Sequence, residues 1–190
     1  RINKYHEKHQ IKDQSSYING TKVPSIEKML SLIDWDYMSD GQISNFHGDL
    51  QFDNVLLKDD GDFLLLDWRQ DFSGIVEYGD QYYDLAKLNG GMQVSYKLIK
   101  QGGFSFHANK SGEIVLEHDT PKELLNAREI FKSFLIDKDL DVNKVEVLTS
   151  LIYLNMSPMH HEPFNHFIYN FGKLSLYKAL SVQGKVYGEK

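Results

Sequence analysis

The chain has 190 residues, which suits a single domain, and 41% hydrophobic and 25% charged residues are ordinary values for a folded protein. The lack of cysteine excludes a disulfide scaffold, a thiol nucleophile and a cysteine-ligated metal centre. A net charge of −6 gives no basic footprint for nucleic acid or an anionic membrane, and no apolar run approaches the ~20 residues of a membrane-spanning helix. The polar start carries no signal-peptide pattern, so we expect a cytoplasmic protein that binds neither nucleic acid nor membrane.

The first third of the chain predicts short elements. Residues 1–20 are polar and indicate the end of a helix followed by a loop. The segment 24–33 predicts a short helix, because Pro-Ser precedes a periodic apolar pattern. The apolar runs 55–57 and 63–66 flank a turn that contains Asp and Gly, which predicts a β-hairpin.

The middle of the chain predicts one long helical segment and a second hairpin. Residues 80–100 are helical in pattern, and Gly90-Gly91 predicts an interruption or bend, since glycine weakens a helix. The segments 104–107 and 114–116 flank an Asn-Lys-Ser-Gly turn and predict the hairpin.

Three helices are expected in the last third. Thr120-Pro121-Lys122-Glu123 has the spacing of a capping box and begins the first of them. Asp141 can cap the second, which Pro158 ends. The third runs over 163–180. The whole pattern predicts a mostly helical α+β domain with two small hairpins, and it does not predict a βαβ array.

Negative charge is concentrated in the segment 34–84, which holds thirteen acidic residues and only two basic ones. Such a segment suits a hard cation or a cationic ligand. The alternative is solvated loops, because Asp favours turns and caps. For the acids around Gly61, which are Asp59, Asp60 and Asp62, we favour the solvated turn.

The hairpin at 55–66 has a polar residue at each open end. Asn54 precedes its first strand and Asp67 follows its second, so the two are expected to be paired neighbours, roughly 5 Å apart at the backbone. Both carry hard oxygen ligands and can hold Mg²⁺. Asp49 lies on the same loop as Asn54. It can orient a hydroxyl and accept its proton as a bond to phosphorus forms.

This ordered set resembles the catalytic half of the protein-kinase-like fold: His47-x-Asp49-x-x-x-x-Asn54, a hairpin, then Asp67. Gly48 in place of the protein kinases' Arg, and Asp67-Trp68 in place of their Asp-Phe-Gly, indicate the aminoglycoside phosphotransferase and choline kinase family. The run Gly79-Asp80-Gln81-Tyr82-Tyr83-Asp84-Leu85-Ala86 resembles that family's Gly-Asp-Pro-x-x-Asp-Leu-Ala element, with Gln81 in place of Pro. Together these motifs span residues 46–86.

The resemblance implies a role for each matching residue. Asp49 would be the catalytic base, and Asn54 and Asp67 would bind Mg²⁺. His47 would brace the loop through backbone contacts, and Asp84 would support it from the following helix. The alternative for Asp49, Asn54 and Asp67 is loop capping, which their combined spacing disfavours.

Other residues have two readings. Arg69 can contact a phosphate or an anionic substrate, or it can neutralise Asp71 or Glu77. Tyr83 is a candidate for the wall of a substrate pocket, although an aromatic residue on a helix is more often part of the core.

A histidine-rich stretch lies near the last helix. His160 and His161, with Glu162 and His166, invite a zinc hypothesis, but their spacing matches no zinc motif. A loop facing the substrate is the favoured reading for His160 and His161, because the resemblance puts the acceptor pocket among the later helices.

By the resemblance, residues 1–45 are helices and a loop leading into the domain, 46–86 the catalytic and metal-binding segment, and 87–190 the helical acceptor region. No glycine-rich phosphate loop is visible, and ~45 residues before the catalytic loop are too few for the family's amino-terminal nucleotide lobe. We therefore expect the carboxy-terminal lobe alone. Its missing partner would be that nucleotide lobe or a fused domain.

The expected function is transfer of the γ-phosphate of ATP, with Mg²⁺, to a hydroxyl of a small molecule such as a sugar, a polyol or an amino alcohol. The sequence looks most like bacterial family members associated with polysaccharide or sugar metabolism, some of which resemble fusions to a nucleotidyltransferase domain. The lobe alone is expected to be inactive. The alternatives are a non-catalytic binding or regulatory module derived from a kinase lobe, and metal-dependent hydrolysis through Asp49 and Asp53.

Overall fold

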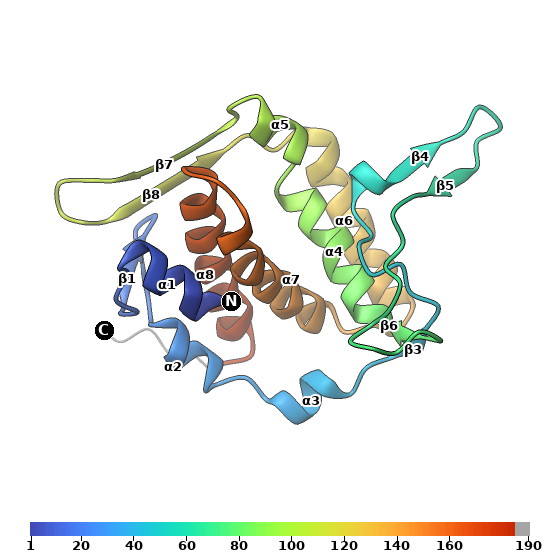
Figure 1. Ribbon diagram of the computed structural model, residues 1–190, viewed down its shortest axis with the longest axis horizontal. Helices are drawn as coiled ribbons and strands as arrows, with labels where there is room; N and C mark the ends of the chain where they lie inside the picture. The colour runs from blue at the N-terminus through green and yellow to red at the C-terminus, as the bar shows by residue number, and fades with distance from the viewer. Residues whose placement is uncertain (185–190) are drawn as a thin grey trace.

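Two long helices form the centre of the molecule. The computed structural model describes residues 1–184, and in it α7 (Val142–Met156) packs along α8 (Phe164–Val182) (Figure 1). The largest fully buried side chains of this helix pair are Leu154, Phe167, Ile168, Leu176 and Leu180. Burial of apolar surface is the main favourable term in folding, so this pair supplies the principal core.

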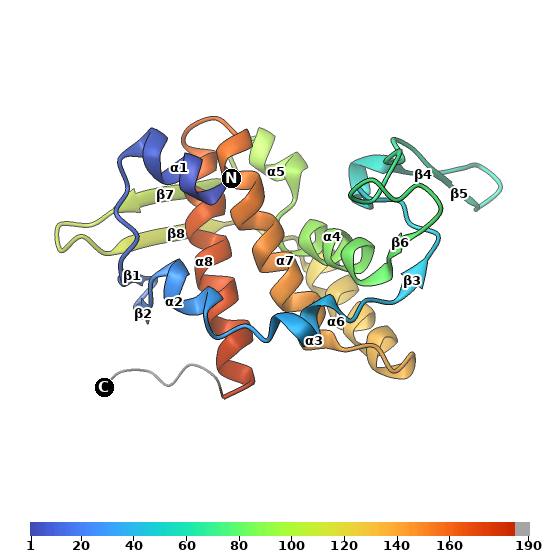
Figure 2. The same cartoon turned by 60° about the horizontal axis from the view of Figure 1, so that its bottom comes forward.

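A second pair of helices carries one wall of the candidate site. Figure 2 shows α4 (Gln81–Gln93) and α6 (Lys122–Asp137) on the side of α7 opposite α8. The remaining helices are short: α1 (Ile2–His9), α2 (Ile26–Leu30), α3 (Trp35–Ser39), α5 (Tyr96–Lys100), and the 3-10 turns η1 (Phe52–Asn54) and η2 (Ser157–Met159). About half of the chain is helical, and with its small sheets it is an α+β fold.

A four-stranded sheet covers one side of the central helices. Its order is β2 (Thr21–Val23), β1 (Ser16–Ile18), β8 (Ile114–His118) and β7 (Phe104–Ala108). The second predicted hairpin, β7–β8, is confirmed. The loop predicted for residues 1–20 is wrong in part, because β1 and β2 form a hairpin around Asn19-Gly20, both at positive φ. This dipeptide is a strong hairpin signal, and the structure joins β1 in parallel to β8 through Ile18 and Ile114.

Two further sheets have two strands each. With β1–β2 the described residues hold three hairpins, so the expected total of two is too small. The predicted hairpin around the Asp/Gly turn is confirmed as β4 (Val55–Leu57) and β5 (Phe63–Leu65). In addition, β3 (Ile43–Ser44) pairs with β6 (Gly79–Asp80). Figure 1 shows β4–β5 projecting from the body at the end opposite β7–β8.

Three predicted helix boundaries are confirmed: the start of α2 and both ends of α7. Ser25 accepts a hydrogen bond from the Lys28 backbone N–H and caps α2. Asp141 accepts one from the Lys144 backbone N–H and caps α7, which ends just before Pro158. The last helix also lies where it is expected. These ends follow from short polar side chains satisfying the free N–H groups of a first turn.

Two local predictions are wrong for reasons of tertiary structure. The predicted helix over 80–100 is interrupted at Val94-Ser95, between α4 and α5, and not at Gly90-Gly91, where the Tyr153 hydroxyl of α7 donates to the Gly90 carbonyl at 2.8 Å. The capping box does not form. Thr120 donates instead to the Gln93 carbonyl at 3.5 Å, and Pro121 lies just before α6 as its N-cap.

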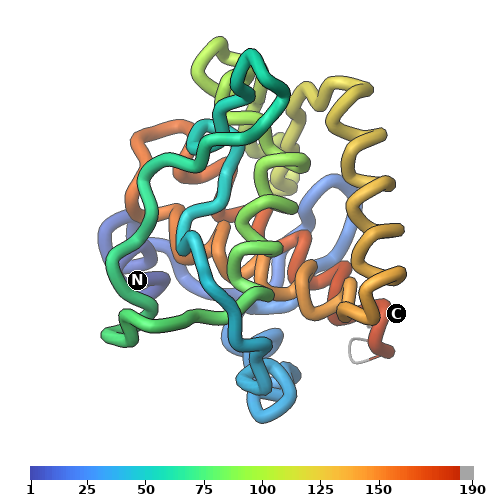
Figure 3. Tube along the Cα trace, turned by 90° about the vertical axis from the view of Figure 1, so that its right-hand side faces the viewer, coloured from blue at the N-terminus to red at the C-terminus, as the bar shows by residue number. Residues whose placement is uncertain are grey.

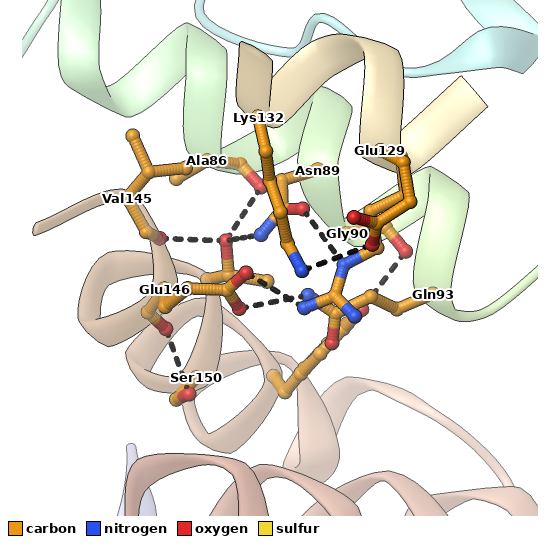
Figure 4. Close-up of polar contacts among 12 residues, drawn as sticks. Ala86, Asn89, Gly90, Gln93, Glu129, Lys132, Val145, Glu146 and Ser150 are labelled. Carbon is orange, nitrogen blue, oxygen red and sulfur yellow. Dashed lines mark hydrogen bonds and ion pairs between the residues drawn. The ribbon is translucent and has the colours of Figure 1, made fainter. Parts of the chain in front are cut away.

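A polar network joins α4, α6 and α7 (Figure 4). Asn89 donates to the Thr149 hydroxyl at 3.0 Å, and Thr149 in turn lies 3.1 Å from the Ala86 carbonyl. Arg128 of α6 pairs with Glu146 of α7 at 2.6 Å and also reaches the Asn89 side chain. Buried polar groups with partners fix one arrangement, so this network sets the position of α4.

We expect Gly172→Ala to destabilise the protein. A Cβ at this position in α8 would lie 2.9 Å from Tyr153 Cβ on α7, so the helix pair would have to separate. The free energy of unfolding in urea should fall by about 1–3 kcal/mol, the usual cost of overpacking a core.

The matched control is Gly90→Ala in α4, where the nearest atom, the Tyr153 hydroxyl oxygen, would lie 3.4 Å from the new Cβ. Alanine favours helix over glycine by roughly 1 kcal/mol, so this variant should be neutral or more stable. Equal effects of the two substitutions would contradict the close approach of α7 and α8.

None of the helices in residues 1–184 combines the length and apolarity needed to cross a bilayer.

Candidate active site

The 47–54 loop is held in place by one carboxylate of α4. Asp80 caps this helix through the Tyr82 N–H, which puts Asp84 in the first turn. The two carboxylate oxygens of Asp84 accept from the backbone N–H groups of His47 at 2.6 Å and Gly48 at 2.8 Å. All three residues are buried. Figure 3 shows the segment between α3 and α4 crossing the face of α4.

Asp49 is buried between two cations. Its Oδ2 accepts from the Arg69 guanidinium at 2.6 Å, and its Oδ1 forms an ion pair with the Lys87 ammonium at 2.7 Å. Burial raises the pKa of Asp49, but Lys87 and Arg69 outweigh burial, so the pKa lies below its ordinary value of 3.8. The carboxylate is therefore ionised at neutral pH.

His47 lies under the loop. Its Nδ1 accepts from the Asp49 backbone N–H at 3.2 Å, and the Trp68 ring covers it at a centroid distance of 4.9 Å. Nε2 of His47 is buried and has no hydrogen-bond partner in residues 1–184. With Nδ1 as acceptor, Nε2 carries the ring proton. His47 thus supports the Asp49 backbone without reaching the open side of the loop.

Gly48 is required by its surroundings. Its φ is +79°, a conformation that side chains rarely adopt, and a Cβ would lie 2.6 Å from Cβ and Cγ of Arg69. The Arg69 backbone N–H also donates to the His47 carbonyl at 2.9 Å. Glycine here lets the Arg69 stem cross the loop and bring its guanidinium to Asp49.

The hairpin register differs from the predicted one by one residue. Val55 is opposite Leu65, and the Leu66 N–H donates to the Asn54 carbonyl at 2.9 Å, so Leu66 and not Asp67 is opposite Asn54. The turn sets this register, since five residues separate the paired Leu57 and Phe63 and each step back along the hairpin then puts Asn54 opposite Leu66. Asp67 has a left-handed backbone with φ of 57°. Asp67 follows directly after this pair.

Asn54 and Asp67 carry oxygen atoms of the type that a hard cation prefers. The Asn54 amide N–H donates to the Asp49 carbonyl at 2.9 Å, and its side-chain oxygen has no hydrogen-bond partner within residues 1–184. The Asp67 carboxylate is exposed and makes no hydrogen bond or ion pair within residues 1–184. An amide oxygen and a free carboxylate are a donor set that suits Mg²⁺.

Arg69 and Lys87 make contacts that the sequence did not predict. Arg69 makes a local ion pair, but with Asp49 and not with Asp71 or Glu77. Lys87 is not among the site residues expected from the sequence. Its position three residues after Asp84 on a helix was the available signal, because residues at this spacing share a face.

A cavity of about 270 Å³ opens beside the loop. Gln51, Phe52 and Asp53 from the loop line it, together with Gly91 of α4 and Tyr96 of α5. A smaller, adjoining hollow shares Gln51 and Tyr96 and includes Lys87. The cavity therefore lies next to the Asp49 ion pairs and has an aromatic and polar wall.

Three candidate site residues remain, which are His160, Tyr83 and His161. His160 is half-buried with Nε2 3.5 Å from the Tyr96 hydroxyl, and burial, then His161 and Lys87, lowers its pKa. Tyr83, half-buried on α4, has its pKa raised by burial and by Asp49. His161 is exposed and makes no side-chain contact that would bring it to the cavity within residues 1–184.

The β4–β5 hairpin presents an apolar surface next to the site. Its side chains and those just after it are strongly exposed, in particular Leu56, Leu57, Phe63, Leu64, Leu66 and Trp68. Successive residues of a strand point to opposite faces, so these side chains lie on both faces of the hairpin. Exposed apolar side chains gathered on one element are typical of a binding region.

No protein-family model, curated protein or solved structure matches the chain. The functional argument therefore depends on the residues and their geometry.

We expect Asp49→Asn to destabilise the protein in a pH-dependent way. Because the folded-state pKa is lowered, the unfolded chain binds the proton more readily, and stability from Asp49 is present above about pH 4 and lost as the pH falls through the folded-state pKa. The difference in free energy of unfolding between wild type and D49N should be large at pH 7 and shrink below pH 4.

Chemical denaturation from pH 7 to pH 3 measures this difference. Asp53→Asn is the control, since Asp53 is exposed in the same loop and its loss should cost less than about 0.5 kcal/mol at pH 7. A D49N difference that stays constant over this range would contradict the ion pairs.

Proposed function

We propose that this chain is the catalytic and acceptor-binding lobe of an ATP-dependent small-molecule kinase related to the aminoglycoside phosphotransferase and choline kinase family. The observation that carries the proposal is the Asp49 carboxylate. It lies on a loop braced by Asp84 and is kept ionised by Lys87 and Arg69. The same loop lines a cavity of about 270 Å³, and the adjoining hollow includes Lys87, the ion-pair partner of Asp49.

In this proposal Asp49 orients the acceptor. The hydroxyl of a sugar, polyol or amino alcohol in the cavity donates to Asp49, and its oxygen attacks the γ-phosphorus of ATP in line. The new O–P bond forms as the bond from the γ-phosphorus to the β–γ bridging oxygen breaks. The hydroxyl proton passes to Asp49 and ADP leaves. Phosphoryl transfer has a loose transition state, so positioning and charge carry most of the catalysis.

In this proposal Arg69 has a second role. The Arg69 side chain is 55% exposed, so its guanidinium can also reach a phosphate oxygen. Asn54 and Asp67 would hold Mg²⁺ through their unused oxygens. When bound, this ion would neutralise charge on the phosphates.

The nucleotide lobe in this proposal is a separate folding unit that docks on the β4–β5 surface. The exposed leucines and Phe63 supply apolar area for an adenine ring or for the lobe that covers it. Reaction with ATP suits the cytoplasm, and the lack of cysteine fits a reducing compartment.

We expect the full-length gene product to transfer phosphate from Mg·ATP to one member of a panel of sugars, polyols, choline and aminoglycosides. Asp49→Asn should lower kcat by about 10²–10⁴-fold, the usual contribution of a general base, and leave nucleotide binding intact. Asp36→Asn is the control and should retain activity, since Asp36 is exposed on α3 and does not line the cavity.

Two outcomes would contradict this prediction. Transfer that D49N leaves unchanged would remove Asp49 from the chemistry. Robust transfer by residues 1–190 alone would show that the chain needs no separate nucleotide lobe.

A second candidate function has its own observation. Both oxygens of Asp49 are already paired with cations, an arrangement that stabilises a loop without any chemistry. A non-catalytic binding or regulatory module derived from a kinase lobe would keep these contacts. Such a module would bind ligand in the cavity, and D49N would affect its stability but no turnover.

Lys87 separates the two candidates, because it is proposed to act on the reaction through Asp49. Lys87→Met removes the charge 2.7 Å from Oδ1 and so raises the pKa of Asp49. Below that pKa the base is protonated, so the acid limb of kcat/KM should move up by about one pH unit or more, and Lys87→Arg should restore it.

Lys100→Met is the control, since Lys100 is exposed and its nearest acid is Asp53, at 3.8 Å. An acid limb that K87M and K100M leave at the same pH would contradict the role of Lys87.

A further inference from the structure

Three side chains of types that bind transition metals come together outside the Asp49 loop. His9 ends α1, Glu162 precedes α8, and His166 lies in the first turn of α8. Nδ1 of His9 is 3.4 Å from Oε1 of Glu162, and Nε2 of His166 is 3.6 Å from the same oxygen. The two ends of the chain supply this cluster, so His9 replaces His160 and His161 in the set considered from the sequence.

The spacing of these atoms fits one small cation. One ligand atom from each residue lies within 4.8 Å of the others. Ligands about 2.0–2.1 Å from a tetrahedral zinc ion lie about 3.3–3.4 Å from one another. The two distances to Oε1 of Glu162 are within a few tenths of an ångström of this value, and the two histidine nitrogens lie within 4.8 Å of each other. The three ligand atoms are therefore close enough to converge on one ion.

The other nitrogen of each histidine ring already has a partner. The Asn165 amide hydrogen-bonds Nε2 of His9 at 3.2 Å, and the buried Tyr5 hydroxyl hydrogen-bonds Nδ1 of His166 at 2.6 Å. Phe106 stacks on the His166 ring at 5.4 Å. The Tyr5 hydroxyl can accept from Nδ1–H of His166, which leaves Nε2 for an ion. The Asn165 amide nitrogen only donates, so Nδ1 of His9 carries the ring proton in this arrangement, and an ion at Nδ1 requires that this proton leaves and that Asn165 turns its side-chain oxygen to Nε2.

Burial gives the cluster one open side. The His9 side chain is 9% exposed and that of His166 is 21%, whereas Glu162 is 65% exposed. An ion can therefore approach past Glu162. Two imidazoles and one carboxylate suit a borderline cation and not Mg²⁺ or Ca²⁺, which prefer oxygen ligands.

We propose that His9, Glu162 and His166 bind one Zn²⁺ ion, with water in the fourth position. The ion would clamp α1 to the start of α8. Tyr5 is wholly buried in the core, so the clamp would hold in place the only apolar side chain of α1 that is fully buried in the part of the chain described.

The test uses untagged chain, stripped of metal with a chelator, so that no histidine tag contributes. Isothermal titration should give one Zn²⁺ per chain, and Mg²⁺ should not compete. Zn²⁺ should raise Tm, because an ion that binds only the folded state stabilises it. Co²⁺ should give the visible bands of a four- or five-coordinate site.

Variants assign the site. His9→Ala and Glu162→Gln should each remove Zn²⁺ binding and the Tm increase; Glu162 is exposed, so E162Q keeps the fold. Tyr5→Phe, which removes only the hydroxyl, should weaken binding by roughly 10–100-fold. His161→Ala is the matched control, an exposed histidine beside Glu162, and Asp49→Asn is the control for the other site. Both should bind Zn²⁺ as wild type does.

Three results would overturn the proposal. The first is no stoichiometric Zn²⁺ uptake by the wild-type chain, which would make the cluster a metal-free group of ion pairs. The second is uptake that E162Q and H9A leave unchanged. The third is uptake that H161A reduces as much as H9A does.

Discussion

The site depends on one carboxylate that binds two backbone N–H groups. Asp84 accepts from His47 and Gly48, and each hydrogen bond to a charged group is worth about 1.5–3 kcal/mol. Asp84 can do this because α4 is itself fixed to α6 and α7 by the Asn89 and Arg128 network. Core packing is thus transmitted to the loop through a helix, and the position of Asp49 follows.

Opposing electrostatic effects meet at Asp49. Burial penalises its charge, and without Lys87 and Arg69 the carboxylate would hold its proton more tightly. Lys87 and Arg69 outweigh the effect of burial, and in doing so they occupy both carboxylate oxygens of Asp49. A substrate hydroxyl would have to share an oxygen with one of them, and Arg69, with the more exposed side chain, is the one with room to move.

Local signals in the sequence predicted much of the framework, and long-range contacts account for the failures. The caps at Ser25 and Asp141 and the β4–β5 and β7–β8 hairpins depend on neighbouring residues, so they were predictable. The continuation of α4 through Gly90-Gly91 depends on Tyr153, and the pairing of β1 with β8 depends on strands far apart in sequence.

The same distinction applies to the candidate site. The spacing of Asp49, Asn54 and Asp67 was visible in the sequence, but the register of the hairpin was not, because it depends on where the turn begins and ends, and the sequence does not fix those limits to one residue. Lys87 could have been found from its helical spacing to Asp84. His9 could not be found from the sequence, because no residue near it indicates that Glu162 and His166 lie beside it.

The backbone of Gly48 and its contact with Arg69 have a consequence for sequence divergence. A side chain at position 48 would occupy the space of the Arg69 stem, and the positive φ there strains any side chain whatever residue stands at 69. Chains descended from a common ancestor with this one should therefore keep Gly48, which in turn allows the Arg69 stem to cross the loop. Glycine at this position is thus a diagnostic for distant relatives, one that reports shared loop geometry even where the surrounding sequence has drifted.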